Sequence, residues 1–350
     1  MFRQLPESRT NFNILCLETT CDETAAAIIS QELEVLGSVV ATQEKLHEEF
    51  SGVVPEIAAR AHVERILPVI DQTLRQSKME LSELDAVAVA NTPGLSGSLL
   101  VGVVAAKTLA VALGIPLIAV NHLHAHVYAC QLDADESIYP CIGMVVSGGH
   151  THLYQYEDAL TAVYLGGTID DAAGEAFDKV ASMLGLPYPG GPAISKKAVD
   201  GDSKAYDFPR SFLNEERLDF SFSGLKTAVR YAIAGPGEVD FEGLQLEEKT
   251  ICDVAASFQQ AVVDCLVHKA LQAAKTTNMS TLCVGGGVAA NRSFRDQLAE
   301  ACQRVGITLR IAPLKYCTDN AVMGAIAIER YRAGLFESLD LDIQPGLIRH

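Results

Sequence analysis

Short runs of apolar residues, each bounded by polar turns, begin at residue 13 and predict β-strands at 13–18, 24–30 and 34–41. The next segment, 55–77, has Pro at its start and apolar residues at helical spacing, which predicts an amphipathic helix. The elements predicted after it are a strand at 85–90, a helix at about 97–113, a strand at 117–120 and a helix over about 121–133. The first part of the chain therefore has the order β-β-β-α-β-α-β-α.

A second set of elements in the same order begins near residue 141. It consists of strands at 141–147, 151–157 and 161–166, a helix at about 170–185, a strand at 280–285, a helix at 288–304, a strand at 308–311 and a helix at 319–333. The irregular segment 186–250, rich in Pro, Gly, Asp and Lys, indicates an insertion in this second set. Two α/β lobes with the same order of elements normally face each other across a cleft, so we expect an α/β fold of two duplicated lobes.

Chain length agrees with this division, since 350 residues suit two domains or two lobes of one fold. We expect an N-terminal extension at 1–12, a first lobe at 13–135, a second lobe at 136–318 with its insertion at about 186–250, and a C-terminal helix and tail at 319–350. The apolar stretch 99–120 is similar to a membrane span, but Lys107 lies at its centre and the sequence GIP interrupts it. A buried helix followed by a buried strand is the expected structure, with no membrane involved.

Composition and charge exclude several classes of protein. The chain has 27 Lys and Arg against 44 Asp and Glu, a formal net charge of −17, which argues against a protein that grips nucleic acid over its whole surface. A hydrophobic fraction of 49% excludes a mainly disordered chain. The nine cysteines are odd in number and show no C-x-x-C spacing, which favours reduced, buried thiols in a cytoplasmic protein. The first residues contain no apolar core of a secretory signal.

Three glycine-rich turns, at 93–97, 147–150 and 285–287, each follow a predicted strand. Glycine lets a backbone approach a ligand closely and point its amides at phosphate oxygens. Any one of these turns could be an ordinary tight turn, but three of them at strand ends favour a nucleotide-binding cleft. The spacings match neither the Walker nor the Rossmann glycine motif.

The turn ETTCDET at 18–24 concentrates carboxylates and hydroxyls, and its Asp22 and Glu23 are candidates for chemistry. Such a turn could face phosphate, a metal or metal-bound water. Asp and Thr also favour turns because they bond their own backbone there, so the local sequence leaves both interpretations open.

A second acidic string, IDDAAGEAFDK, places Asp171, Glu175 and Asp178 on one face of the predicted helix. These carboxylates either face solvent, or one of them binds the hydroxyls of a ribose. The segment 196–230 is near neutral in an acidic chain, so it is the part best suited to touch a phosphate backbone.

Two histidines, His122 and His126, lie at i and i+4 in NHLHAH and would share one helix face. Paired imidazoles suit a divalent metal, whereas a single His is more often a surface or core residue. The zinc-protease motif H-E-x-x-H is absent because Leu123 follows His122. A third ligand must come from elsewhere; Asp319, at a predicted helix start, is one candidate, and its alternative role is a helix N-cap.

Together these segments resemble the TsaD family of tRNA threonylcarbamoyladenosine transferases. The motifs that carry the resemblance are ETTCDET, VVPEIAARAH, HLHAH, VVSGGHTHL, IDDAAGEAFDK, YPGGP, DFSFSGLKT, GGGVAANR and CTDNAVMGA. The resemblance implies the two-lobed actin/Hsp70/sugar-kinase-like (ASKHA) fold, with lobes that face a nucleotide cleft. It also implies transfer of threonylcarbamoyl from threonylcarbamoyl-AMP to the exocyclic amine of the adenosine 3′ to the anticodon, in tRNAs that read codons beginning with A.

The same resemblance implies one divalent metal per subunit, held by His122, His126 and Asp319. In the family this metal is usually given as iron(II), with zinc and magnesium as alternatives. The sequence departs from the family at Thr92, where Gly is common, and at His124 and the following Ala, where Glu-Gly is common. The additional imidazole of His124 could compete for the metal.

Substrate contacts are also implied by the matching motifs. Asp178 would take the ribose hydroxyls, and the other contacts would be Val145, Val146, Ser147, Gly148, Gly149, Gly191 and Asn291. Asp22 and Glu23 are the candidates for handling the proton of the attacking amine.

The expected partners are tRNA, a TsaB-like paralogue and a TsaE-like ATPase, in the cytoplasm. The net charge of −17 predicts weak tRNA binding by this chain alone. Two other functions stay open. An ATPase or phosphotransferase of the same fold would not need the histidine pair, and a metal-dependent peptidase, or a non-catalytic binding module, is the second alternative.

Overall fold

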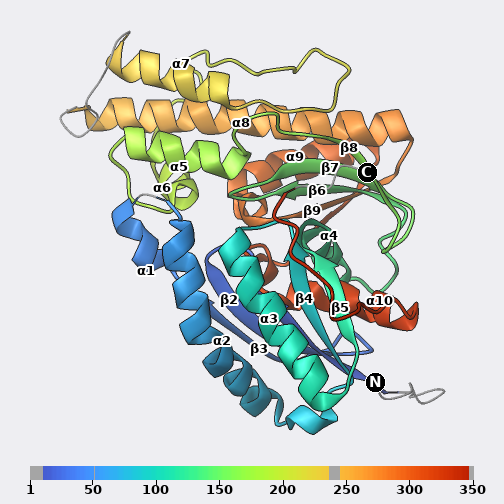
Figure 1. The fold of residues 1–350 in the computed structure, drawn as a ribbon. Helices are drawn as coiled ribbons and strands as arrows, with labels where there is room; N and C mark the ends of the chain where they lie inside the picture. The colour runs from blue at the N-terminus through green and yellow to red at the C-terminus, as the bar shows by residue number, and fades with distance from the viewer. Residues whose placement is uncertain (1–10, 51, 236–244, 347–350) are drawn as a thin grey trace. The chain divides into compact units, whose positions relative to one another are not determined.

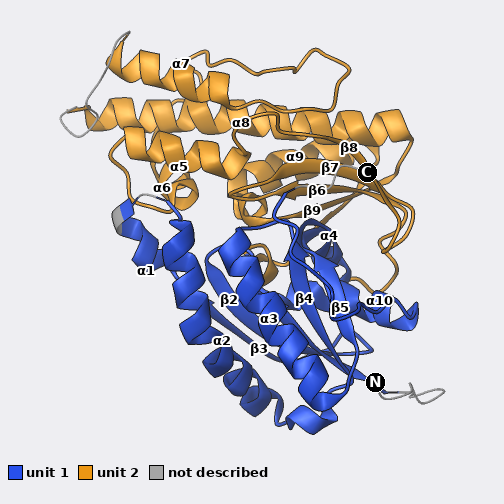
Figure 2. Cartoon of the chain, in the orientation of Figure 1, with its two compact units in different colours: residues 1–133, 319–350 blue, residues 134–318 orange. Residues whose placement is uncertain are grey.

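In the computed structural model the chain divides into two compact units, and the structure describes residues 11–50, 52–235 and 245–346. Unit 1 consists of residues 1–133 and 319–350, and unit 2 of residues 134–318 (Figure 2). Each unit contains a five-stranded mixed sheet with helices packed on it (Figure 1). The C-terminal segment therefore returns to the unit in which the chain begins.

The sheet of unit 1 has the strand order β3-β2-β1-β4-β5. The strands are β1 (Asn13–Glu18), β2 (Glu23–Ser30), β3 (Val35–Thr42), β4 (Ala86–Thr92) and β5 (Leu117–Asn121). β1, β2 and β3 form an antiparallel meander, while β4 pairs parallel with both β1 and β5. This confirms the strands predicted for the first part of the chain, with boundaries that differ by one or two residues.

The helices of unit 1 follow the predicted order, except that α1 was not predicted and that the C-terminal part differs. They are α1 (Glu44–His47), α2 (Pro55–Ser77), α3 (Ser96–Leu113), α4 (His122–Tyr128) and α10 (Ala327–Arg332), with 3-10 turns η1 (Glu48–Phe50), η2 (Leu81–Glu83), η3 (Ala129–Gln131) and η6 (Ala321–Ile326). Residues 319–333 were expected to form one helix, and the structure instead has a 3-10 turn followed by a short α-helix. Residues 121–133 likewise contain only the shorter α4 and η3.

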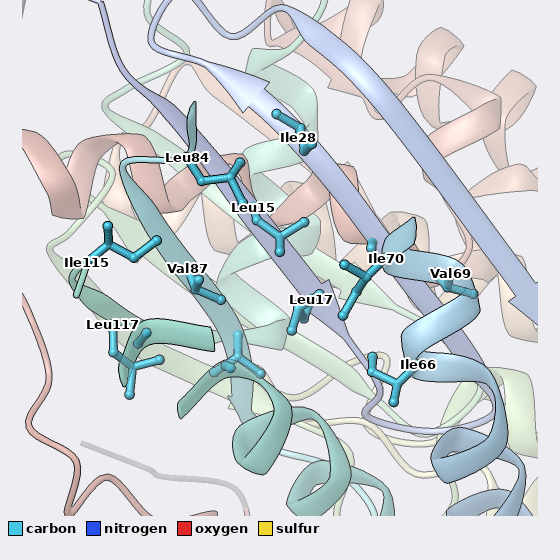
Figure 3. Packing of buried hydrophobic residues seen from close by; sticks show 14 of the residues in the cluster. Leu15, Leu17, Ile28, Ile66, Val69, Ile70, Leu84, Val87, Ile115 and Leu117 are labelled. Atoms are coloured by element: carbon cyan, nitrogen blue, oxygen red, sulfur yellow. The ribbon is translucent and has the colours of Figure 1, made fainter. Parts of the chain in front are cut away.

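The core of unit 1 lies between its sheet and the helices α2 and α3. Leu15 and Leu17 of β1 belong to one buried cluster with Ile66 and Ile70 of α2, as Figure 3 shows. Cys16 points the other way and donates to the carbonyl oxygen of Gly324 in η6, at 3.4 Å. Because successive side chains of a strand alternate between faces, β1 is covered on both sides, and its last residue, Glu18, is carried into the interior.

Unit 2 has the strand order β10-β9-β6-β7-β8. Its strands are β6 (Cys141–Val146), β7 (Thr151–Tyr156), β8 (Ala162–Gly167), β9 (Thr281–Gly285) and β10 (Thr308–Ile311). Its helices are α5 (Ala173–Met183), α6 (Gly190–Ala198), α7 (Ser223–Ala234), α8 (Glu248–Thr277) and α9 (Arg292–Val305), with 3-10 turns η4 (Gly287–Ala290) and η5 (Leu314–Tyr316). In its described residues the predicted insertion, at about 186–250, contains α6, α7 and the first residues of α8; the 30-residue α8 was not predicted.

Two helices, α3 and α8, are long and apolar enough to cross a membrane by length and composition. A mostly buried core helix passes the same test, and 72% of the apolar window of α8 is buried inside the structure. In α3 that share is 33%, and its outward side chains include Leu100, Val104 and Val111. These two helices are therefore weak evidence for a membrane.

Candidate functional site

The polar turn between β1 and β2 is held in place by a glycine turn from another part of unit 1. The amide of Leu95 donates to the carbonyl oxygen of Thr20, at 2.8 Å. A Cβ on Gly94 would lie 2.7 Å from the same oxygen, so the close approach requires glycine. The amide of Gly94 donates to the carbonyl oxygen of Pro345. The turn at 93–97 therefore serves packing, and these two amides are not available to a phosphate.

The histidine pair is positioned by the cap of α4. The side-chain oxygen of Asn121 accepts from the amides of Leu123 and His124, at 2.9 and 3.3 Å, so the helix begins at His122. His122 and His126 then share one helix face, and their ring centroids lie 4.6 Å apart. Both side chains are almost completely buried.

Asp319 lies beside both imidazoles. Its Oδ1 atom is 3.2 Å from Nε2 of His126 and 3.7 Å from Nε2 of His122. Asp319 was also a candidate for the N-cap of a helix, but the N-cap is the next residue, Asn320. The side-chain oxygen of Asn320 accepts from the amides of Val322 and Met323 at the start of η6. One ligand atom from each of the three residues lies within 4.8 Å of the others, all within unit 1.

The arrangement fits a divalent metal. Both ring nitrogens of His126 are buried and make no hydrogen bond within the described part of the chain, which would be costly without another ligand. Two imidazole nitrogens and one carboxylate oxygen are a donor set that suits iron(II) or zinc. Burial alone would lower the pKa of His122, but the carboxylates of Asp319 and Glu18 outweigh it and raise that pKa to about 9. Negative charge thus accumulates where a cation would bind.

His124, the additional imidazole, is not part of this group of three. Burial and the nearby guanidinium of Arg330 lower the pKa of His124 to about 4. Because it lies between the other two in sequence, its side chain leaves the helix in another direction.

The two carboxylates proposed for proton handling lie in the polar turn and at the start of β2. Burial raises the pKa of Glu23 well above its ordinary value, and the carboxylates of Asp319 and Asp22 raise it further. The carbonyl oxygen of Asp22 accepts from the amide of Gln43, which ties the turn to the end of β3. A carboxylate of raised pKa is a stronger base than an ordinary carboxylate, so Glu23 suits a role in proton transfer beside the three candidate ligands.

Several residues at this site were not singled out from the sequence. Glu18 and Thr20 both reach Nδ1 of His122, at 3.1 and 3.2 Å. The buried His62 of α2 binds the same turn, with Nε2 3.0 Å from the carbonyl oxygen of Cys21 and Nδ1 2.8 Å from Oγ1 of Thr24. All of them occur in the motifs ETTCDET and VVPEIAARAH. The sequence therefore revealed the motifs, but not the contacts that these individual residues make.

In unit 2 the predicted substrate residues begin at the end of β6. Val145 and Val146 are completely buried in the strand, and Ser147 follows them. The carbonyl oxygens of Ser147 and Gly148 accept from the amides of Gly174 and Glu175 in the first turn of α5. These helix amides are therefore used within the protein. A Cβ on Gly148 or on Gly149 would meet no described atom within 4 Å, so the backbone here borders open space.

The remaining substrate candidates adjoin this strand end through a series of contacts. Gly190, at the start of α6, donates its amide to Oδ1 of Asp178 in α5, and Gly191 follows it. The Nδ2 atom of Asn291 donates to Oγ of Ser195 and Oε1 of Gln259, while its Oδ1 caps α9. The structure thus brings Asp178, Gly191 and Asn291 together around α5, α6 and the start of α9, and Asn291 is largely occupied in joining helices.

The prediction of one acidic helix face at 171–178 is wrong for Asp171. α5 begins at Ala173, and Asp171 precedes it. Its two carboxylate oxygens bind Nζ of Lys179 and Nζ of Lys226, at 2.7 and 2.8 Å. Asp171 therefore joins the IDDAAGEAFDK and DFSFSGLKT motifs instead of facing solvent.

Comparison with known proteins places these motifs in one family. The model of the family "TsaD: tRNA N6-adenosine threonylcarbamoyltransferase" matches residues 34–326. A protein of that name from Rhodopirellula baltica is 59% identical over 347 residues, covering 96% of this chain and 97% of the relative. The protein of the same name from Bacillus subtilis is 46% identical over 339 residues, covering 95% of each chain.

Solved structures show the same fold at low sequence identity. Full-length HypF in its phosphate- and nucleotide-bound form matches with a TM-score of 0.61 and 14% identity, over 93% of this chain and 56% of that one. Component A of the (R)-2-hydroxyglutaryl-CoA dehydratase of Acidaminococcus fermentans matches with a TM-score of 0.52 and 12% identity, over 92% of this chain and 99% of that one. The fold is therefore ASKHA-like, as expected. The family match, the close relatives and the grouped motif residues lead to one conclusion: the chain belongs to the TsaD family of tRNA N6-adenosine threonylcarbamoyltransferases.

Proposed function

We propose that this transferase takes the threonylcarbamoyl group from threonylcarbamoyl-AMP. The acceptor is the exocyclic amine of the adenosine 3′ to the anticodon, in tRNAs that read codons beginning with A. The observation that carries the proposal is the approach of His122, His126 and Asp319 to one another, with the Glu23 carboxyl of raised pKa close by. The reaction forms an N–C bond, breaks the bond between the carbonyl carbon and the phosphate oxygen, and releases AMP and one proton.

The three grouped side chains would hold the metal, which we propose to be iron(II), with zinc as the alternative. Magnesium is a poorer match because it prefers oxygen ligands. A bound divalent ion supplies Lewis acidity and orients substrate oxygens. The chain itself supplies a base: Glu23, with Asp22 beside it, accepts the proton that the amine loses, which its raised pKa favours. No protein nucleophile is needed because the adenylate is already activated.

For the adenylate we propose the surface formed by the end of β6 and the starts of α5, α6 and α9. The glycines there, Gly148, Gly149 and Gly191, leave space in which a nucleotide can approach the backbone. Asp178 would bind ribose hydroxyls through its carboxylate, which Gly190 already orients. Val145, Val146, Ser147 and Asn291 support this surface from β6 and α9.

We also propose that the chain works with a TsaB-like paralogue and a TsaE-like ATPase in the cytoplasm. The net charge of −17 disfavours tRNA binding by this chain alone. Largely exposed apolar side chains at i and i+4 on the adjacent helices α2 and α3, which are Val63, Leu67, Leu100 and Val104, offer the paralogue a surface to cover. Leu67→Glu should abolish co-elution with the paralogue. Val199→Glu, which alters an even more exposed apolar side chain in unit 2, should not.

The decisive experiment incubates the metal-loaded protein with threonylcarbamoyl-AMP, tRNA and the two partner proteins, followed by mass spectrometry of the digested nucleosides. The modified adenosine should appear with the wild type and fall at least tenfold with His122→Ala. Absence of the modified nucleoside in every reaction would overturn the proposal. ATP turnover that persists in His122→Ala without any tRNA product would instead support an ATPase of the same fold.

A further inference from the structure

Glu18, the last residue of β1, contacts Nδ1 of His122, which is the ring nitrogen that does not face Asp319. Its carboxylate is 3% exposed, and its two oxygens have different partners. Oε1 accepts from the backbone amide of Thr20, at 2.7 Å, and Oε2 lies 3.1 Å from Nδ1 of His122. The hydroxyl of Thr20 lies 3.2 Å from the same ring nitrogen.

An ionised carboxylate can only accept hydrogen bonds, so Nδ1 of His122 must carry the proton in this contact. The other ring nitrogen, Nε2, is the atom that faces Asp319. A hydroxyl both donates and accepts, so Thr20 cannot decide the position of the proton by itself. We propose that Glu18 is a positioning residue that selects the His122 tautomer and ring orientation needed to present Nε2 to the metal. This inference rests on the metal site of the proposed function.

The other histidine of the pair has no such support. Neither ring nitrogen of His126 makes a hydrogen bond among the described residues, and its Nε2 has Asp319 nearby. The protein therefore supports the ring of His122 through a carboxylate at Nδ1, whereas Nδ1 of His126 has no hydrogen-bond partner among the described residues. Outer carboxylates that orient a metal-binding imidazole typically change metal affinity 10–100-fold when removed.

The substitution Glu18→Gln separates the proton effect from packing because it keeps the side-chain shape. Glutamine has one acceptor oxygen where glutamate has two. The amide of Thr20 is a fixed donor and takes that oxygen, so the glutamine NH2 group faces Nδ1 of His122. The ring must then accept at Nδ1 and carry its proton on Nε2, the atom needed by the metal.

The experiment uses the full chain with 15N-labelled histidine. In metal-free protein at about pH 10, where imidazoles are neutral, NMR should show the His122 proton on Nδ1 in the wild type and on Nε2 in Glu18→Gln. Zinc titrated against a chromophoric chelator should bind 10–100-fold more weakly to Glu18→Gln. Thr20→Val, which keeps the backbone amide, should retain the Nδ1 proton and lose much less affinity.

The matched control is Asp85→Asn. Asp85 is also a buried carboxylate that accepts a backbone amide, from Asn13 at 3.0 Å, but Asn13 is the first residue of β1 and lies about 17 Å along the strand from Glu18. Zinc affinity should be unchanged in this variant. If Glu18→Gln does not fold, Glu18→Asp should keep the Nδ1 proton and still weaken zinc binding.

An unchanged tautomer and unchanged zinc affinity in Glu18→Gln would overturn the inference. A wild type that shows the Nδ1 proton but binds neither zinc nor iron(II) would overturn the proposed metal site instead, while supporting the orienting role of Glu18. The two failures are therefore distinguishable.

Discussion

The backbone amide of Gly190 donates a 2.7 Å hydrogen bond to the carboxylate of Asp178. A Cβ on Gly190 would lie 2.6 Å from the Cα atom of Asp178 and from the carbonyl oxygen of Phe177, so α6 can begin this close to α5 only at a glycine. The next residue differs, since a Cβ on Gly191 would contact no described atom within 4 Å. Packing against α5 thus requires glycine at position 190, whereas no packing contact requires it at position 191.

This difference predicts that alanine substitutions at the two positions will have different effects on stability and on nucleotide binding. Gly190→Ala should lower the free energy of unfolding by about 1–3 kcal/mol because it overpacks the contact with α5. Gly191→Ala should change it by less than about 0.5 kcal/mol, yet weaken binding of an AMP analogue if the nucleoside lies there. Urea unfolding and calorimetric titration measure both quantities. Equal stability losses in the two variants would contradict the assignment.

The proposed metal site predicts a second result. Asp319→Asn removes the anionic member of the three proposed ligands and should lower bound iron or zinc at least tenfold, measured by elemental analysis after reconstitution. His126→Ala should do the same. Asp71→Asn, which alters an exposed carboxylate paired with Arg75 on α2, serves as the control and should retain full metal. Full occupancy in Asp319→Asn would remove Asp319 from the site.

Stability should respond to pH through His62. Burial lowers the pKa of His62 below its ordinary value of 6.5, against the opposing effects of the Cys21 carbonyl and of nearby Glu18 and Asp22, and Arg65 lowers it further. The unfolded chain therefore binds this proton more tightly than the folded protein does, and stability contributed by the neutral ring is lost as the pH falls below 6.5.

His62→Gln removes this titration. The wild type should lose its stability advantage over the variant as the pH falls from about 8 to about 5, measured by urea unfolding at each pH. A difference between the two proteins that stays constant with pH would show that His62 does not titrate in this way.

Asp170 predicts a local effect in unit 2. Its carboxylate accepts from the amides of Phe222 and Ser223 at the start of α7 and from the hydroxyl of Ser221. Asp170→Ala should cost about 1–2 kcal/mol, as loss of a helix cap does, and speed amide hydrogen exchange at the start of α7. Ser221→Ala removes only the hydroxyl contact and should cost less. Unchanged exchange in Asp170→Ala would exclude the capping role.

The sequence pattern predicted the sheets better than the helices of unit 2. Strands such as β1 and β6 are short apolar runs between polar turns, which is a local signal. α8 was missed because its residues 252–258 are all buried in succession, so it lacks the one-sided apolar stripe that marks a surface helix. The return of residues 319–350 to unit 1 has no local signal either, since it depends on packing against distant strands.

The candidate site shows the same division between local and distant information. The spacing of His122 and His126 is a local property and predicted their shared face. The choice between ligand and N-cap at Asp319 could not be made locally, because it depends on Asn320 taking the cap and on α4 lying opposite. The role of Glu18 depends on a hydrogen bond that spans the sheet and the start of α4.

Unit 1 is built from two separate segments of the chain, and this has a consequence for biosynthesis. A nascent chain that has reached Thr318 contains both imidazoles but lacks the carboxylate, which is the first residue of the returning segment. We therefore expect ribosome-bound or truncated chains that end before Asp319 not to acquire the proposed metal, so that the proposed centre can form only after this residue has been synthesised.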